Sequence, residues 1–201
     1  MASVEALNVE MFENLYKGDV DKVRDVLQKG ADVNGRDKNG LTPLSVCASA
    51  KGSFLTVREL LKHKNLDANA TEDDGDSPLL AACRVGNLEV VVELLKDNRV
   101  DVNARDCSGD TVLMVAIHRC EQDIAVELLK YAKVDVNLTN NRGYTALLVA
   151  ICRGEQDIAV ELLKHAKVDV NARDCSGYRL HYLNGGHPSW QTRYCCRVTE
   201  T

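Results

Sequence analysis

The chain has 201 residues, of which 45% are hydrophobic and 27% are charged, and its formal net charge is -5 at pH 7. This composition suffices for a packed core, and the negative balance excludes a global electrostatic attraction to nucleic acid or to anionic membranes. No basic segment followed by an apolar run opens the chain, and no stretch approaches the roughly 20 apolar residues that span a bilayer. We therefore expect a cytoplasmic protein, with the nucleus as the alternative compartment, that binds neither nucleic acid nor membrane.

An internal repeat of 34 residues organises the sequence. The segment EQDIAVELLKYAKVDVN at residues 121–137 returns at residues 155–171, and the two copies differ only at Tyr131 and His165. A fixed period of this size is typical of stacked-repeat proteins, in which each repeat buries its apolar face against its neighbours. Such folds usually present a binding surface rather than a reaction centre.

Each full repeat predicts a polar turn, a short first helix and an amphipathic second helix. The turn ends at a glycine, and two residues later comes a hydroxyl side chain that can cap a helix N terminus. A glycine suited to positive φ ends the first helix in most repeats, but Cys120 stands at this place in one of them. The predicted capping residues are Thr42, Ser77, Thr111 and Thr145.

The repeats divide almost the whole chain into similar segments. The first full repeat has one additional residue, which we place among residues 49–52. The predicted segments are an N-terminal capping unit at 1–35, full repeats at 36–70, 71–104, 105–138 and 139–172, and an incomplete repeat with an irregular tail at 173–201.

The motifs TPLSVCA at Thr42 and SPLLAAC at Ser77, the repeated ELLK, and GADVN and VDVN before each turn resemble the ankyrin repeat. The resemblance covers about residues 1–177 and implies an all-α repeat solenoid of helix-turn-helix units joined by β-hairpin-like loops. Tetratricopeptide repeats have the same period, but they lack the glycine-containing segment between helix pairs. The histidine that usually follows the TPL leucine is replaced here by Ser45, Leu80, Met114 and Leu148.

No sequence motif indicates catalysis or a metal site. HExxH, paired CxxC motifs and glycine-rich phosphate loops are absent. The tail contains His181, His187, Cys195 and Cys196, but adjacent cysteines suit one tetrahedral site poorly and the spacing matches no zinc motif. We predict no metal, no other cofactor, and reduced cysteine thiols.

The resemblance implies a non-catalytic protein–protein interaction module, such as a scaffold or adaptor, that binds through its concave surface and hairpin tips. When the repeats are aligned, basic residues share a position near the end of the first helix, which the resemblance places on the concave surface beside acidic hairpin tips. This arrangement favours a ligand segment of acidic or mixed charge. The candidate partner-binding residues are Lys51, Asp73, Asp74, Asp76, Arg84, His118, Arg119, Arg142, Tyr144 and Arg153. Alternatively, the chain is the ankyrin targeting portion, or a truncated isoform, of a larger multidomain protein such as an enzyme or a ubiquitin-ligase subunit.

The turn asparagines carry a second expectation from the resemblance. In ankyrin-like repeats a turn asparagine preceded at the eighth position by leucine is a frequent target of an intracellular asparaginyl hydroxylase. The candidates are Asn69, Asn103, Asn137 and Asn171. Independently of modification, we expect these side chains to stabilise the turns by hydrogen bonds to nearby backbone.

The repeat pattern stops after Tyr178, so the repeat at 139–172 is expected to lack a regular neighbour on its C-terminal side. A terminal repeat without a polar outer face exposes apolar side chains. We expect parts of Leu147, Ile151, Ile158 and Leu162 to meet water and to support weak self-association.

Overall fold

A computed structural model describes residues 3–50 and 53–172. In these ranges it contains ten α-helices and no β-strand, so the fold is the predicted all-α repeat solenoid. The chain forms two compact units, Met1–Cys107 and Ser108–Thr201. The tail predicted at 173–201 and the candidate Lys51 lie outside the described residues.

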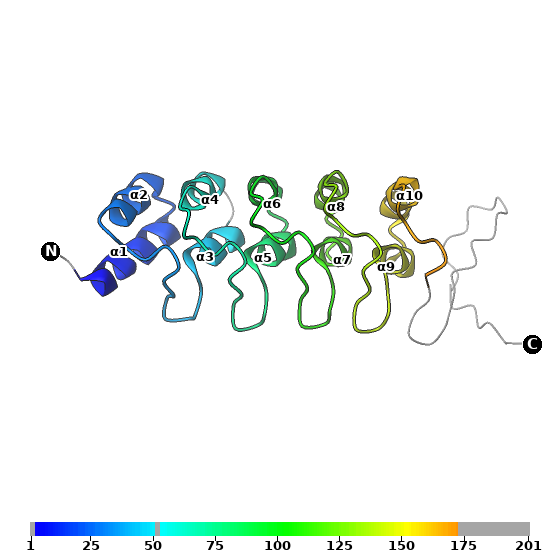
Figure 1. The fold of residues 1–201 in the computed structure, drawn as a ribbon, viewed down its shortest axis with the longest axis horizontal. Helices are drawn as coiled ribbons and strands as arrows, with labels where there is room; N and C mark the ends of the chain where they lie inside the picture. Colours follow the sequence, from blue (N-terminus) through cyan, green and yellow to red (C-terminus); the bar gives the residue numbers. More distant parts are fainter. Residues whose placement is uncertain (1–2, 51–52, 173–201) are drawn as a thin grey trace, which may run out of the picture. The chain divides into compact units, whose positions relative to one another are not determined.

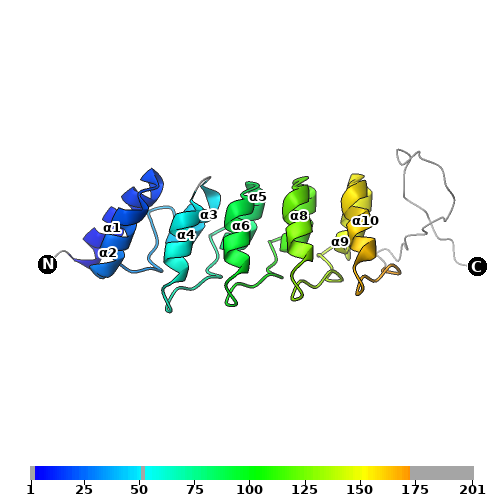
Figure 2. The same ribbon diagram turned by 90° about the horizontal axis from the view of Figure 1, so that it is seen from above.

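The first unit is built from helix pairs that stand side by side. The pairs are α1 (Val4–Lys17) with α2 (Val20–Gln28), α3 (Pro43–Ser49) with α4 (Phe54–Leu61), and α5 (Pro78–Arg84) with α6 (Leu88–Leu95). The two helices of a pair pack together, and each also packs against its counterpart in the next pair. Figures 1 and 2 show the second helices α2, α4 and α6 in one row above the first helices α1, α3 and α5.

The second unit repeats this arrangement with two pairs. They are α7 (Val112–His118) with α8 (Gln122–Leu129), and α9 (Ala146–Arg153) with α10 (Gln156–Lys164). The first helices α7 and α9 pack against each other, as do the second helices α8 and α10.

The predicted helix caps are confirmed. Each capping hydroxyl accepts a hydrogen bond from the backbone amide three residues later, at 3.2 to 3.4 Å. After the first helices, Gly18, Gly86 and Gly154 have φ of 70°, 68° and 77°. Cys120 occupies the same place with φ 59°, and among the described residues it is the only non-glycine with positive φ. The backbone therefore keeps the left-handed conformation here despite the cost of a Cβ atom.

The core of each unit lies between its first and second helices. Leu44 and Leu60 in one repeat, and Leu113 and Leu128 in another, are at most 2% exposed. Each such leucine contributes about 2 kcal/mol to folding by leaving water. The helices α3 and α5 begin 35 residues apart, whereas α4 and α6 begin 34 apart. The additional residue of the first full repeat therefore lies between α3 and α4, as predicted.

Hairpin loops, meaning the segments that lead from the second helix of one repeat to the first helix of the next, close with two backbone hydrogen bonds each before α3, α5 and α9. In the loop before α3 the Asp37 amide donates to the Leu41 carbonyl and the Gly40 amide to the Asp37 carbonyl, both at 3.0 Å. The loops before α5 and α9 repeat this pattern at residues 72–76 and 140–144. Figure 1 shows the loops projecting from the first helices on the side away from the second helices.

Candidate interaction surface

A polar position at the C-terminal end of the first helices binds the hairpin loops. Tyr16, Arg84, His118 and Cys152 share this position, separated by 34 residues or by 68. In the first repeat the Tyr16 hydroxyl donates to Asp37 Oδ2 at 2.6 Å. This hydrogen bond raises the pKa of Tyr16. This hydrogen bond joins α1 to the hairpin loop before α3. The residues around Tyr16 in the sequence gave no indication of it.

Arg84 joins two successive hairpin loops of the first unit. Its guanidinium binds the Asp76 carboxylate, at the base of the loop before α5, through Nε and through Nη2. Nη2 also donates to Asp106 Oδ2, in the following loop, at 2.9 Å. The side chains of Asp76 and Asp106 are only 5% and 7% exposed. The hydrogen bond to Asp76, with a smaller contribution from Asp106, raises the pKa of Arg84.

Two predicted partner-binding residues therefore have a structural role instead. Asp76 is buried, and Arg84 neutralises it within the fold. The sequence pattern placed both residues correctly near the loops. It did not show that their charges bind each other, because that depends on how the loop folds back onto the helix.

The equivalent positions of the second unit also interact, but around the Asp110 carboxylate rather than around a cation. His118 Nε2 lies 3.3 Å from Asp110 Oδ2, and Asn140 Nδ2 donates to Asp110 Oδ1 at 2.7 Å. His118, Asp110 and Asn140 each stand 34 residues after Arg84, Asp76 and Asp106. The candidate His118 thus also contacts a loop carboxylate, while its side chain remains 38% exposed.

Three exposed arginines of the second unit remain available to a ligand. Arg119, Arg142 and Arg153 make no side-chain hydrogen bond or ion pair with any other described residue. Arg119 caps the C-terminal end of α7, and Arg153 is the last residue of α9. Because α7 and α9 pack side by side, these two cations stand at the same end of neighbouring first helices.

The arginines of the first unit differ from these three, because each one has a partner within the fold. Arg58 binds Glu93, for example, and Arg36 donates to the carbonyls of Gly40 and Thr71. The arginines of this unit are Arg24, Arg36, Arg58, Arg84, Arg99 and Arg105.

Acidic side chains gather on the loop before α5. Asp73 and Asp74 are exposed, as a ligand contact requires. Glu72 is half-buried, and its Oε1 is buried without a hydrogen-bond partner. Burial raises the pKa of Glu72, and nearby aspartates raise it further. Glu72 stands in the loop after α3 and α4 at the position that Asp106 occupies one repeat later. Asp106 binds Arg84, the last residue of α5, but the last residue of α3 is Ser49. Glu72 therefore lacks the cation that Asp106 has.

The turn asparagines tie each repeat to the next, whereas the sequence led us to expect hydrogen bonds to the nearby backbone of the same turn. Asn69 Nδ2 donates to the Arg99 carbonyl and its Oδ1 accepts from the Asp101 amide, both at 2.8 Å. Asn34 and Asn137 make the same two bonds with the repeats that follow them. At the N terminus Asn8 Oδ1 accepts from the Asp32 amide at 2.8 Å. Asn8 therefore supplies the bond that a preceding repeat would otherwise provide.

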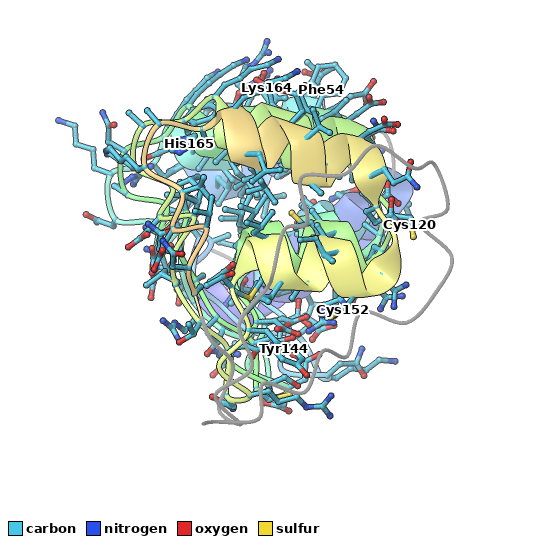
Figure 3. The ribbon with its side chains drawn as sticks, turned by 90° about the vertical axis from the view of Figure 1, so that its right-hand side faces the viewer. Phe54, Cys120, Tyr144, Cys152, Lys164 and His165 are labelled. Carbon is cyan, nitrogen blue, oxygen red and sulfur yellow. The ribbon has the colours of Figure 1, made fainter. Side chains whose placement is uncertain are left out.

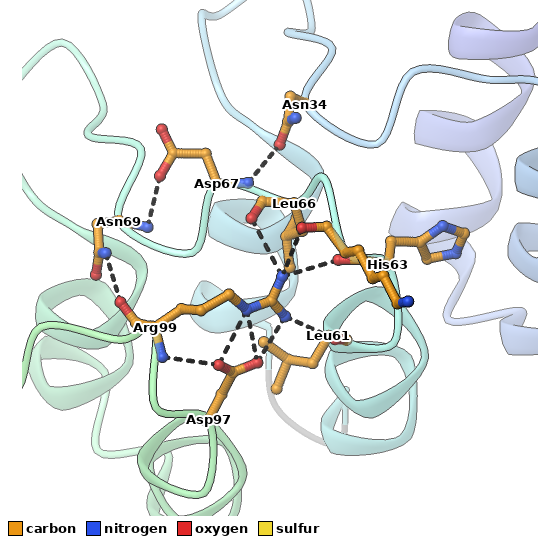
Figure 4. A network of polar contacts seen from close by, with 9 residues as sticks. Asn34, Leu61, His63, Leu66, Asp67, Asn69, Asp97 and Arg99 are labelled. Carbon is orange, nitrogen blue, oxygen red and sulfur yellow. Dashed lines mark hydrogen bonds and ion pairs between the residues drawn. The ribbon is translucent and has the colours of Figure 1, made fainter.

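Arg99 provides a connection that the sequence analysis missed (Figure 4). Its guanidinium binds Asp97 and donates to the carbonyls of Leu61 and His63, at 2.7 and 2.9 Å. These carbonyls lie at the C-terminal end of α4, where helix carbonyls have no partner within the helix. The sequence feature that could have revealed this connection is the segment DNR at residues 97–99, where the two later repeats have YAK and HAK.

The C-terminal side of the second unit is only partly as predicted. Leu147, Ile158 and Leu162 are buried, so the expectation that they meet water was wrong. Ile151 is half-buried, as expected, whereas the equivalent Ile117 is 1% exposed.

The turn of this repeat shows a similar difference. Val170 is 48% exposed, whereas the equivalent Val136 is 1% exposed. In Figure 3, which looks onto this side, Tyr144 lies with the hairpin loops, whereas Lys164 and His165 lie beside the second helix. The candidate Tyr144 is thus on the loop side, and it is half-buried with contacts inside the fold.

Other kinds of site receive no support from the described residues. These ranges contain no group of three or more His, Cys, Asp or Glu side chains placed to hold a metal ion. A groove of about 460 Å³ runs between α2 and α4, but Arg24, Arg58 and Lys62 along it are paired with carboxylates. Across residues 3–50 and 53–172, none of the helices has the length and hydropathy needed to cross a membrane.

Each unit is a set of antiparallel helix pairs joined by hairpin loops, and turn asparagines bond each repeat to the next. This architecture defines a helical repeat protein. A family model described as ankyrin repeats (3 copies) matches residues 11–106 and 86–174. The chain belongs to the ankyrin-repeat family. A 73-residue segment is 27% identical to part of the human transient receptor potential cation channel subfamily A member 1 (Homo sapiens). That alignment covers 36% of this chain and 6% of the channel protein, so the chain spans a small part of this relative.

Proposed function

We propose that this chain is a scaffold or adaptor that binds a protein segment on its inner surface. By inner surface we mean, in each unit, the C-terminal ends of its first helices together with its hairpin loops. Ankyrin repeats are generally protein–protein interaction modules and are typically non-catalytic. The observation that carries the proposal is the presence of Arg119, Arg142 and Arg153, exposed on this surface with no partner among the described residues.

The chemistry of the inner surface favours a ligand segment of acidic or mixed charge. In the second unit the unpaired arginines attract carboxylates, and in the first unit the exposed Asp73 and Asp74 attract basic side chains. Arg84 and Asp76 are excluded from this role because they neutralise each other. Weak self-association through the C-terminal side, where Val170 and Ile151 are more exposed than their equivalents, is a secondary part of the proposal.

Affinity purification with mass spectrometry tests the proposal. The bait is the full chain, compared with Arg119→Glu/Arg153→Glu. The matched control is Lys130→Glu/Lys164→Glu, which makes the same charge change in the same two repeats, but on the second helices. We expect specific proteins to be lost with the arginine variant and retained with the lysine variant. Identical recovery with both variants would show that the inner surface is not the binding site.

A further inference from the structure

The two units use their arginines differently, and this difference indicates where an acidic ligand docks. Each arginine of the first unit has a partner inside the fold, so binding a carboxylate there requires breaking an existing contact. Arg119 and Arg153 have no such contact to break among the described residues. Among the arginines of the described residues, a ligand carboxylate therefore gains a new ion pair without breaking an existing contact only in the second unit.

The positions of Arg119 and Arg153 also indicate how far apart two carboxylates of the ligand should be. Arg119 and Arg153 end neighbouring packed first helices, and packed helix axes lie about 10 Å apart. A polyproline II segment rises about 3.1 Å per residue with three residues per turn, so residues i and i+3 point to the same side about 9 Å apart. In a β-strand residues i and i+3 point to opposite faces, which fits two neighbouring cations less well.

We propose that the second unit binds an extended, polyproline II-like acidic protein segment with two carboxylates three residues apart, one on Arg119 and one on Arg153. This inference rests on the proposed function and names the ligand class of the same surface. The first unit contributes no arginine to this recognition. The ligand is recognised through paired charges at a fixed spacing rather than through an apolar pocket.

The test uses fluorescein-labelled peptides and the full chain, with binding measured by fluorescence anisotropy. The probe is PPPEPPEPPP, and the comparison peptides are PPPQPPQPPP and PPPPEEPPPP. Two exposed ion pairs of ordinary strength correspond to about a fivefold change in affinity. We expect the probe to bind about fivefold more tightly than the glutamine peptide and more tightly than the adjacent-glutamate peptide. The advantage should disappear with Arg119→Gln/Arg153→Gln and persist with Lys130→Gln/Lys164→Gln.

Two results would overturn the inference while leaving the proposed function intact. One is equal binding of the two glutamate peptides, which would show that the protein does not distinguish glutamates three residues apart from adjacent ones. The other is tighter binding of PPPEPPEPPP than of the glutamine peptide by the Arg119→Gln/Arg153→Gln variant, which would show that these two arginines do not bind the glutamates. Tighter, arginine-dependent binding of a single-stranded decanucleotide would instead overturn both the inference and the proposed function, because it would assign the surface to nucleic acid. The proposed function itself is judged separately, by whether affinity purification recovers proteins that depend on this surface.

Discussion

Arg84 Nη2 lies 2.9 Å from Asp106 Oδ2, and this contact joins the end of a first helix to the hairpin loop of the next repeat. Tyr16 makes the corresponding contact with Asp37 one pair of repeats earlier. A position that looks like a ligand contact in the sequence is therefore a tie between repeats. The residue directly after it, Arg119 or Arg153 in later repeats, points to solvent instead.

Replacing Arg84 should destabilise the fold. Arg84→Met leaves the buried Asp76 carboxylate without its cation, and breaking such a pair is strongly unfavourable. Because the Arg84 side chain is 31% exposed, water compensates in part, and we expect a loss of about 2 kcal/mol in the free energy of unfolding. Urea denaturation followed by circular dichroism measures it. Arg119→Met is the control and should change stability by no more than about 0.5 kcal/mol.

The pair between Arg58 and Glu93 should make stability depend on acidity. The hydrogen bond from Arg58, aided by Lys96 and opposed by burial, lowers the pKa of Glu93 from 4.5 to about 2. A lowered pKa stabilises the folded state above pH 4.5, and this stabilisation is lost as the pH falls toward 2. Because Arg58 is 52% exposed, we expect Glu93→Gln to cost only about 1 kcal/mol at pH 7.

The difference in unfolding free energy between Glu93→Gln and the parent chain should shrink between pH 4.5 and pH 2. Glu127→Gln is the matched control, because Glu127 pairs with Lys130 and stands at the equivalent position one repeat later. It should cost less than Glu93→Gln at pH 7. An equal cost for both would show that the arginine adds nothing.

Glu72→Gln should stabilise the protein at neutral pH. Burial and the neighbouring aspartates raise the pKa of Glu72, so its charged form is disfavoured in the folded state. Stability linked to this group is fully present below pH 4.5 and decreases as the pH rises through the raised pKa. We expect a gain of about 0.5 kcal/mol at pH 7 that vanishes below pH 4.5. Thermal unfolding at both pH values checks this, with Glu10→Gln, at an exposed position within α1, as a neutral control.

Cys120→Gly should also stabilise the fold. Cys120 is exposed and has φ 59°, so the substitution relieves backbone strain without removing a buried side chain. We expect an increase of about 1 kcal/mol in unfolding free energy. Cys120→Ala separates the causes, because it removes the thiol but keeps the Cβ atom and should bring no gain. A lower melting temperature for Cys120→Gly would mean that the thiol has a stabilising role.

Hydroxylation by an asparaginyl hydroxylase is expected at Asn69, Asn103, Asn137 and Asn171, and most readily at Asn171. Asn171 is exposed, whereas the other three are half-buried. Asn69 and Asn137 also have both amide atoms bonded to the next repeat, so modification requires the loop to open. Peptide mass spectrometry after incubation with the enzyme measures the added oxygen at each site. Asn34, with Val26 rather than leucine eight residues before it, serves as the internal control. Unmodified asparagine at all four sites would refute the expectation.

The sequence by itself determined the features that depend on local chemistry. The 34-residue period, the caps at Thr42 and Ser77, and the positive φ at Cys120 follow from residue types at fixed spacings, because helix ends and turns are set within a few residues. The sequence also predicted that Asn69 stabilises its turn by hydrogen bonds, but it did not predict that the partners, Arg99 and Asp101, belong to the next repeat.

Only the tertiary structure decided which charges are free. Arg84 and Arg119 occupy adjacent places in their repeats, yet Arg84 binds two loop carboxylates and Arg119 binds none among the described residues. The distinction depends on where Asp76 and Asp106 come to lie when the loops fold back onto the helix. Burial of those carboxylates makes pairing necessary, and the partners of Arg84 stand 8 and 22 positions away along the chain, so the identity of the arginine alone does not reveal the pairing.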